Sequence, residues 1–309
     1  MRYLPMVYVV NLLFVAAPMA FAEMELAITV DDLPTHSSVP MGVDRVSIAK
    51  KLLKALTQYH VPEVYGLINA VKISEDPASL NVLKQWLKSG YPLGNHTFSH
   101  KNINRVPIEE FKVDIEKNEQ LLKELTRDTG WRFFRYPFLI EGGDLERRNA
   151  IRGFLKDRGY TIAQVTVDFK DWSWNAPYTR CSNKKKKDEI RWLRKSYVAY
   201  AKFKLQQAKA VTDYIYKRPV KHILLLHIGA FDAEMLEEVL HVYKDLGVKF
   251  IPLSDAIKDE IYSYDPGQVS NHGDEFTFQV MKARGVKLKD IGLPEENVYP
   301  EDKLNSICK

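Results

Sequence analysis

Short apolar runs alternate with longer amphipathic segments along most of the chain. The apolar runs have the length of buried strands, whereas the segments between them repeat apolar residues every three or four positions, as helices do. We predict strands at residues 26–30, 64–68, 132–135, 161–167, 222–226 and 248–252, with a further short segment at 91–94. We predict helices at residues 44–59, 77–89, 108–126, 144–157, 188–217 and 233–246.

Repeated alternation of strand and helix predicts a parallel sheet with helices outside it. About seven such units favour a distorted (β/α) barrel, and an open doubly wound sheet is the alternative. In a barrel, the chemistry lies just after the C-terminal ends of the strands. Polar residues stand at these ends, namely Asp31 and Asp32, His96, Arg135, residues 168–172, and His227.

The chain divides into three predicted segments. Residues 1–22 begin with Arg2, continue with an apolar run and end in Ala-Phe-Ala, which is typical of a cleaved secretory signal. An uncleaved membrane anchor is the alternative. Residues 23–264 form the predicted catalytic domain. The strand–helix pattern stops after Tyr264, so residues 265–309 are predicted to be a C-terminal extension packed on that domain.

Charge and cysteine content add two expectations. Without the signal, the chain has a net charge of only +4, because 44 basic residues face 40 acidic ones. We expect no nucleic-acid partner. Cys181 and Cys308 are the two cysteines, and an even count in an exported protein indicates a disulfide, with two free thiols as the alternative.

Two short motifs contain candidate metal ligands. His96 and His100 are four residues apart, which places their side chains on one face of a helical turn, where two imidazoles can bind one metal ion. Asp31 and Asp32 end an apolar strand, where two carboxylates are costly unless a cation compensates them. Each motif alone has an ordinary explanation, as two surface histidines or as an exposed acidic turn.

Together these motifs resemble the polysaccharide deacetylase family, carbohydrate esterase family 4. The resemblance continues through Arg-Tyr-Pro-Phe at residues 135–138, Asp-Phe-Lys-Asp-Trp at 168–172 and Leu-Leu-Leu-His at 224–227. All five motifs stand in the family's order between residues 29 and 227, each at a predicted strand end. The C-terminal extension lies outside them.

The resemblance implies a ligand set and a proton-transfer system. Asp32, His96 and His100 would bind one divalent metal ion; zinc suits these ligands, although cobalt, nickel or iron can replace it. Asp31 would be the general base and would pair with Arg135. His227 would be the general acid, and Asp171 would be its hydrogen-bonding partner. The backbone N–H of Phe138 would stabilise the oxyanion. Leu225 and Trp172 would be the two walls of the slot for the acetyl group.

Some of these residues have alternative interpretations, and the chain departs from the family at two points. His227 can be a satisfied buried histidine, Arg135 a structural ion pair and Trp172 a core residue. Leu33 stands where the family often has glycine. Tyr136 and Phe138 stand where it often has proline and tyrosine. Neither departure removes a ligand.

Trp172, Trp174 and Tyr178 are predicted on a loop, where exposed aromatic rings can stack on sugars; core packing is the alternative.

The resemblance and the signal together predict an exported N-deacetylase, located in the periplasm or outside the cell. The expected partner is an amino-sugar polymer, with peptidoglycan first and chitin oligomers or poly-N-acetylglucosamine as alternatives. A non-catalytic glycan-binding module on the same fold is a second hypothesis, and an amidase acting on peptides or small amides is a third. After signal cleavage we expect no stable membrane insertion, and the sequence does not specify an oligomeric state.

Overall fold

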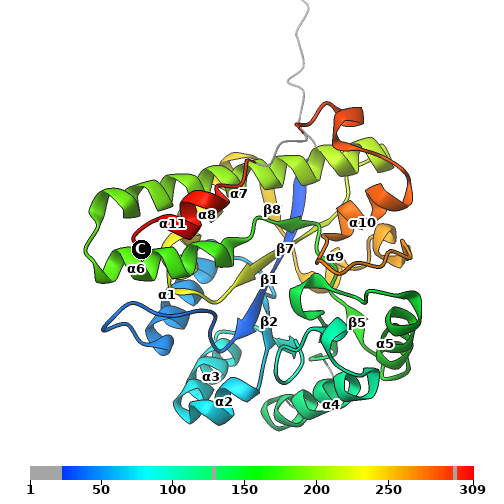
Figure 1. The fold of residues 1–309 in the computed structure, drawn as a ribbon, viewed down its shortest axis with the longest axis horizontal. Helices are drawn as coiled ribbons and strands as arrows, with labels where there is room; N and C mark the ends of the chain where they lie inside the picture. Colours follow the sequence, from blue (N-terminus) through cyan, green and yellow to red (C-terminus); the bar gives the residue numbers. More distant parts are fainter. Residues whose placement is uncertain (1–22, 127–129, 295–297) are drawn as a thin grey trace, which may run out of the picture.

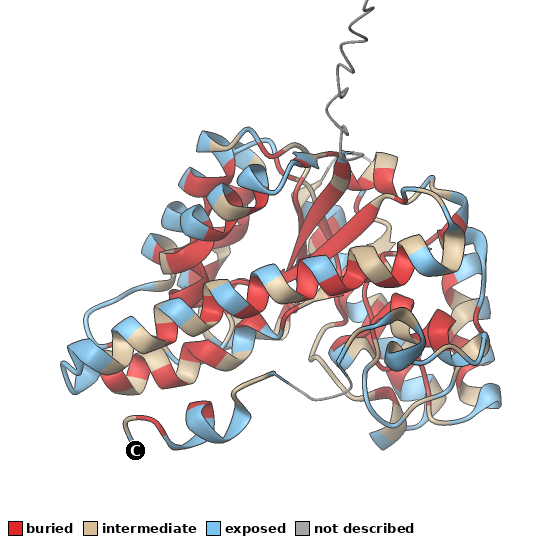
Figure 2. Cartoon of the chain, turned by 90° about the horizontal axis from the view of Figure 1, so that it is seen from above, coloured by how far each residue is buried: buried red, intermediate tan, exposed pale blue. Residues whose placement is uncertain are grey.

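A computed structural model of the chain describes residues 23–126, 130–294 and 298–309; the predicted signal segment lies outside them. A curled sheet of buried strands occupies the centre, and helices pack around it (Figures 1 and 2). The strand order is β5-β4-β3-β2-β1-β7-β6, and β8 pairs with β1. All these pairs are parallel. The predicted distorted (β/α) barrel is therefore confirmed.

The elements follow one another in the predicted alternation. The strands are β1 (Met24–Leu33), β2 (Tyr65–Ile68), β3 (Leu93–Asn95), β4 (Phe133–Phe134), β5 (Thr161–Ile162), β6 (Val167–Asp168), β7 (His222–His227) and β8 (Val248–Phe250). The α-helices are α1 (Arg45–Gln58), α2 (Val71–Glu75), α3 (Leu80–Lys88), α4 (Ile108–Leu125), α5 (Leu145–Asp157), α6 (Asn175–Asn183), α7 (Lys187–Tyr216), α8 (Ala230–Asp245), α9 (Leu253–Ala256), α10 (Phe276–Ala283) and α11 (Glu301–Ser306).

Strand β1 is the axis of the sheet. Nine of its ten residues are buried, as expected for a parallel strand covered by helices on both sides. It pairs with β2 and with β7, and the second pairing sets Asp31 directly opposite His227. The pairing of two central strands therefore brings together residues that are 196 positions apart in the sequence.

Two helices begin where the sequence supplies a capping aspartate. The side chain of Asp44 accepts a hydrogen bond from the backbone N–H of Ser47 and starts α1. Asp144 does the same for Arg147 at the start of α5. Such caps satisfy backbone donors that have no partner in the first helical turn. The predicted helix boundaries are therefore right to within a residue or two at these ends.

Three local predictions are wrong. Residues 96–100, placed on a helical turn from the spacing of the two histidines, form a bend with left-handed φ at Thr97 and His100. The strand predicted at 161–167 is divided into β5 and β6, which belong to opposite ends of the strand order. The segment after β6, predicted as a loop, is a 3-10 turn (Asp171–Trp174) followed by α6. Pro177 does not prevent this helix, because it stands in the first turn, where its missing N–H is not needed.

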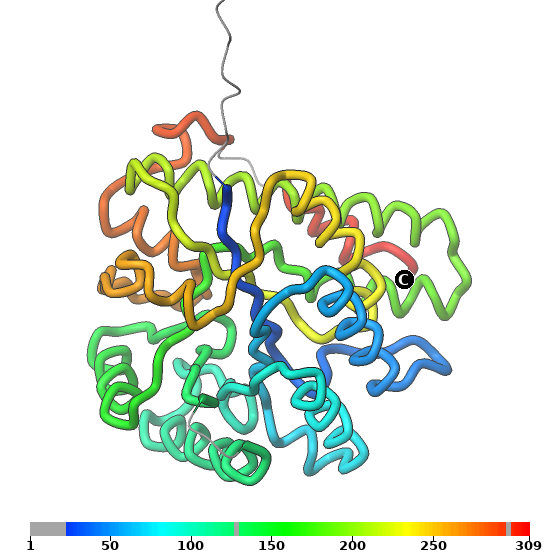
Figure 3. Tube along the Cα trace, turned by 180° about the vertical axis from the view of Figure 1, so that it is seen from behind, coloured from blue at the N-terminus to red at the C-terminus, as the bar shows by residue number. Residues whose placement is uncertain are grey.

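The C-terminal extension packs on the domain at two places. Near its start, the backbone N–H of Phe276 donates to Val165 O at 2.6 Å, and Glu275 forms a buried ion pair with Lys204 of α7 at 2.5 Å. At its end, α11 lies beside α6 and α7 (Figures 1 and 3). There Cys308 forms the predicted disulfide with Cys181 of α6.

Within the described ranges, no helix combines the length and the apolar character needed to cross a bilayer.

Candidate active site

A pocket of about 360 Å³ opens at the C-terminal ends of the central strands. This is the position at which barrels of this type carry their functional residues. The structure brings nearly all of the predicted site residues to this one pocket. Its lining consists of Asp31, Asp32, His36, His96, His100, Tyr136, Phe138, Leu139, Asp168, Lys170, Trp172, Leu225, His227 and Gly273.

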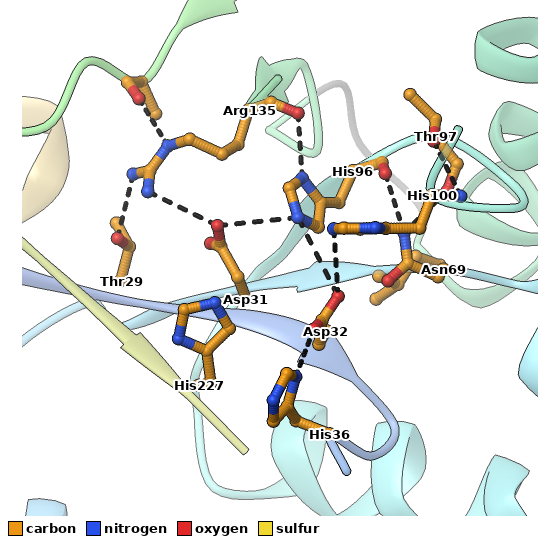
Figure 4. Close-up of polar contacts among 12 residues, drawn as sticks. Thr29, Asp31, Asp32, His36, Asn69, His96, Thr97, His100, Arg135 and His227 are labelled. Carbon is orange, nitrogen blue, oxygen red and sulfur yellow. Dashed lines mark hydrogen bonds and ion pairs between the residues drawn. The ribbon is translucent and has the colours of Figure 1, made fainter. Parts of the chain in front are cut away.

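Asp32, His96 and His100 form a compact group on one side of this pocket (Figure 4). Oδ1 of Asp32 is 3.5 Å from Nε2 of His100 and 3.9 Å from Nε2 of His96. One ligand atom from each residue lies within 4.8 Å of the others, which is close enough for one cation to contact all three. The predicted ligand set is therefore brought together in space.

The chain holds His96 in the orientation that a metal ligand requires. Nδ1 of its ring donates to the backbone oxygen of Arg135 at 2.8 Å, which leaves Nε2 facing Asp31 and Asp32. Metal-binding histidines commonly have one ring nitrogen fixed in this way. Asn69 donates to the backbone oxygens of His96 and Thr97, and these hydrogen bonds also fix the turn after β3.

The protonation states agree with cation binding. Burial and the neighbouring His100 hold the pKa of His96 well below its usual range, so the ring is neutral. Burial would raise the pKa of Asp32, but the hydrogen bond from His36 and the charge of Lys72 hold it well below its usual range. Oδ1 of Asp32 is buried and accepts no hydrogen bond from the described residues. Neutral imidazoles and an ionised carboxylate with a free oxygen are what a divalent metal needs.

Asp31 stands beside this group and is paired with Arg135. Oδ2 of Asp31 is 3.4 Å from Nη1 of the guanidinium, which also donates to Thr29 Oγ1 and to Ala163 O. Burial raises the pKa of Asp31 to about 6, and the charges of Arg135 and His227 limit the rise. A buried carboxylate with this pKa can take up a proton near neutral pH, as a general base must.

His227 faces Asp31 from β7 and is held by Asp171. Nδ1 of the ring is 2.7 Å from one carboxylate oxygen of Asp171, and the backbone N–H of His227 donates to the other at 2.6 Å. Burial alone would lower the pKa of His227, but Asp171, with Asp32 and Asp31, outweighs it and raises the pKa to about 10. The imidazolium form is therefore available as a proton donor.

The backbone around the pocket is strained at several residues other than glycine. Left-handed φ angles cost such residues on the order of 1–3 kcal/mol each, and they concentrate at functional sites because the surrounding structure must hold them. Around this pocket they occur at Asp32, Thr97, His100, Phe138, Leu139 and Lys170. The surrounding fold therefore holds both the candidate ligand group and the rim at Phe138, Leu139 and Lys170 in strained backbone conformations.

The two predicted walls of the acetyl slot, Leu225 and Trp172, and the predicted oxyanion donor Phe138 all line the pocket. Leu225 is buried at its base, whereas Phe138 and Trp172 are exposed at its rim. The ring of Phe138 meets His100 edge to face at 4.5 Å. The other two aromatic candidates do not reach the pocket: Trp174 is fully buried in the core, and Tyr178 packs on Phe231.

Sequence reasoning missed His36, Leu139 and Gly273 of the pocket lining and Lys72 beside it. Nδ1 of His36 is 2.5 Å from Oδ2 of Asp32, and Lys72 donates to the backbone oxygens of Asp32 and Thr35. Gly273 belongs to the extension, and a Cβ there would lie 1.7 Å from Phe138 O, so only glycine fits. The spacing of Asp32 and His36 was visible in the sequence, but the path of the loop between them was not.

Comparison of the sequence with known proteins finds similarity to one family. Residues 20–154 match the family model described as polysaccharide deacetylase. One peptidoglycan-N-acetylglucosamine deacetylase of Bacillus cereus is 30% identical over 154 residues, which cover 49% of this chain and 48% of that protein. A second protein of this name from B. cereus is 23% identical over 240 residues, covering 76% of this chain and 89% of its own. The chain thus spans about half the length of the first relative.

Solved structures share the fold. A carbohydrate esterase family 4 pseudoenzyme from Bacillus anthracis superposes with a TM-score of 0.52 at 15% identity, covering 77% of this chain and 66% of that one. A polysaccharide deacetylase from B. cereus superposes with a TM-score of 0.50 at 17% identity, covering 74% and 91%. At these identities the structural similarity establishes only a common fold. The function has to be argued from the residues of the pocket.

Proposed function

Because residues 20–154 match the polysaccharide deacetylase family, we propose that the chain hydrolyses N-acetyl groups of N-acetylglucosamine units in an extracytoplasmic polysaccharide. One observation carries this proposal. A candidate ligand group, an Asp31–Arg135 pair and an Asp171–His227 pair face one another across a single pocket. A glycan-binding module would have no need for all three.

Asp32, His96 and His100 would bind one divalent metal, for which we propose zinc. When bound, the metal would supply Lewis-acid chemistry that polarises the acetyl carbonyl and makes water more acidic. Asp31 takes the proton of the attacking water while Arg135 orients its carboxylate. The backbone N–H of Phe138 would stabilise the oxyanion.

Cleavage of the C–N bond requires a proton on the departing nitrogen. His227 faces Asp31 from the neighbouring strand and can donate that proton, with Asp171 fixing the ring. The products are acetate and a free amine on the sugar. Leu225 and Trp172 line the part of the pocket in which the acetyl methyl group would lie.

We propose peptidoglycan as the first substrate because two relatives carry peptidoglycan deacetylase in their names. Chitin oligomers and poly-N-acetylglucosamine are the alternatives. This choice requires export, which we propose from the apolar N-terminal segment.

The test is acetate release from purified peptidoglycan, N-acetylglucosamine oligomers and a small acetamide, each with and without a chelator. We expect release from the polymer, loss with chelator and recovery on adding zinc. Acetate release unaffected by chelator would contradict the metal proposal. No acetate from any substrate, together with binding to glycan, would favour the non-catalytic module.

A further inference from the structure

His36 contacts the candidate metal ligand Asp32, although it lies outside the five motifs of the resemblance. Its ring nitrogen Nδ1 donates to Oδ2 of Asp32 at 2.5 Å (Figure 4). Oδ1 of the same carboxylate lies toward His96 and His100 and accepts no hydrogen bond from the described residues. The two oxygens therefore have different surroundings: the chain binds one of them, and the other is available to a cation.

The backbone fixes the position of His36 from two directions. The N–H of Thr35 donates to Asp32 O at 2.9 Å, and the N–H of His36 donates at 2.9 Å to the oxygen of Ile228, directly after β7. Lys72 of α2 donates to the oxygens of Asp32 and Thr35 at 3.3 and 2.8 Å. The loop after β1 is thus tied both to the end of β7 and to α2, and it presents the imidazole to Asp32 from a fixed position.

The carboxylate of Asp32 has a competing partner in Lys72. Nζ of Lys72 is 3.6 Å from Oδ1, the oxygen that lies toward the two histidines. The terminal torsion of an aspartate side chain is soft, so a carboxylate without a partner on Oδ2 can turn toward the ammonium group. The hydrogen bond from His36 opposes this rotation, because it holds Oδ2 on the side away from His96 and His100 (Figure 4).

We propose that His36 is a positioning residue of the metal site: it holds the Asp32 carboxylate so that Oδ1 points to the place where His96 and His100 would bind the cation. The inference rests on the proposed metal-dependent function and adds a residue to its metal site. Carboxylates that bind metals are commonly oriented by such a hydrogen bond, and loss of the partner typically costs about 10- to 100-fold in metal affinity.

Direct binding of a cation by His36 is the alternative role. Asp32, His36 and His227 also offer one ligand atom each, and these atoms lie within 4.8 Å of one another. The geometry favours positioning, because Oδ2 of Asp32 already accepts the hydrogen bond from His36 and a cation bound between them would have to displace it. The number of zinc ions bound per chain distinguishes the two roles.

The experiment measures zinc binding by the full chain, with a chromophoric chelator as competitor, for the unmodified protein, His36→Leu and His36→Asn. The amide nitrogen of asparagine can replace Nδ1 as the donor, whereas leucine fills the space without a donor. We expect one zinc per chain in each protein. The Kd for zinc should rise about 10- to 100-fold in His36→Leu and by less than about tenfold in His36→Asn.

A matched control and a spectrum separate positioning from stability. His241 and Asp245 form an exposed pair with the same spacing on α8, so His241→Leu should leave the Kd for zinc unchanged. Cobalt bound in place of zinc reports the geometry of its ligands, so its visible spectrum at saturating metal should change in His36→Leu and not in His36→Asn. His36→Ala replaces His36→Leu if that variant fails to fold.

The outcomes also separate this inference from the proposed function. An unchanged Kd for zinc in His36→Leu, or equal losses of affinity in both His36 variants, would overturn the positioning role and leave the deacetylase proposal standing. A second zinc that is lost in His36→Leu would show that His36 is a ligand and would overturn it as well. Zinc binding that depends on His36 in a protein that releases no acetate would support the inference and refute the deacetylase activity.

Discussion

The two sides of the catalytic pocket are built in different ways. On the β1 and β3 side, Asp31, Asp32 and His96 are buried: the two aspartates lie at the end of β1, where Asp31 pairs with His227 of β7, and His96 directly follows β3. At the rim, Gly273 comes from the extension, lies against the backbone of Phe138 and is held by contacts between loops and helices. In the proposed reaction, the first side would supply the groups for bond cleavage, and the second would limit which substrates can enter. Substitutions on the two sides should therefore have different signatures.

The largest effect is expected at the ligand group. His100→Ala removes one of three ligands, so the protein should lose bound metal and at least about a hundredfold in kcat/KM, because Lewis-acid stabilisation is worth several kcal/mol. Elemental analysis and acetate release measure both. His241→Ala, at an exposed histidine of α8, is the control and should change neither. Full metal content in His100→Ala would refute the ligand assignment.

The base should give the next largest effect. Asp31→Asn keeps the shape of the side chain but cannot accept a proton, so turnover should fall about 10²- to 10⁴-fold with metal content unchanged. Asp188→Asn on the exposed start of α7 controls for the substitution type. An active Asp31→Asn protein would place the base elsewhere.

His227→Ala tests the proton donor from the other strand. We expect a loss of similar size, because the departing nitrogen would leave without a proton, and metal content should again be unchanged. The loss should be smaller on a substrate whose leaving group is a weak base and needs less protonation. Equal losses on both kinds of leaving group would argue against His227 as the acid.

The pair Asp171–His227 predicts a shift in pH dependence. His227 must hold its proton to act as an acid, so activity should fall as pH rises through its pKa of about 10. Asp31 must be ionised, so activity should fall as pH drops through about 6. Asp171→Asn removes the charge that raises the pKa of His227. Its alkaline limb should move down by about one to three pH units while the acidic limb stays in place.

A full pH profile of kcat/KM for the unmodified protein and for Asp171→Asn measures this shift. An alkaline limb that stays at the same pH in Asp171→Asn would mean that another group controls it.

The two sides also differ in how far the sequence predicts them. Asp31, Asp32, His96, Arg135 and His227 all stand at the ends of apolar runs, and the C-terminal ends of parallel strands meet at one edge. A periodic pattern is therefore enough to place them together. Their roles came from the resemblance, since a pattern alone does not tell a ligand from a buried histidine.

The other side carries no comparable pattern. Gly273 stands in a polar stretch without periodicity, and its approach to Phe138 depends on how the whole extension folds. The helix that follows Trp174 was also predicted as a loop, because its buried positions do not form a continuous apolar stripe. His36 was missed because its contact with Asp32 depends on a turn that local spacing does not specify.

The smallest effect on catalysis is expected from the disulfide at the end of the extension. Cys181 and Cys308 close a loop of 127 residues. Loop entropy puts the stabilisation at up to about 5 kcal/mol, so Cys308→Ser should lower Tm measurably. The pocket wall at Gly273 is fixed separately, by the Glu275–Lys204 pair and by the bridge between Gly142 and Ser270. Turnover of a small acetamide should therefore change by less than about twofold, within the range of surface substitutions.

Thermal melts and acetate release on the small acetamide and on polymer check this together. Treatment of the unmodified protein with a reductant is the control and should reproduce the lower Tm. A change in preference among polymers without loss on the acetamide would show that α11 also helps to position the substrate-binding wall. Equal losses of activity on all substrates would mean that the disulfide affects only the stability of the protein. In that case, the part of the extension around Gly273 would shape the pocket, and α11 would not.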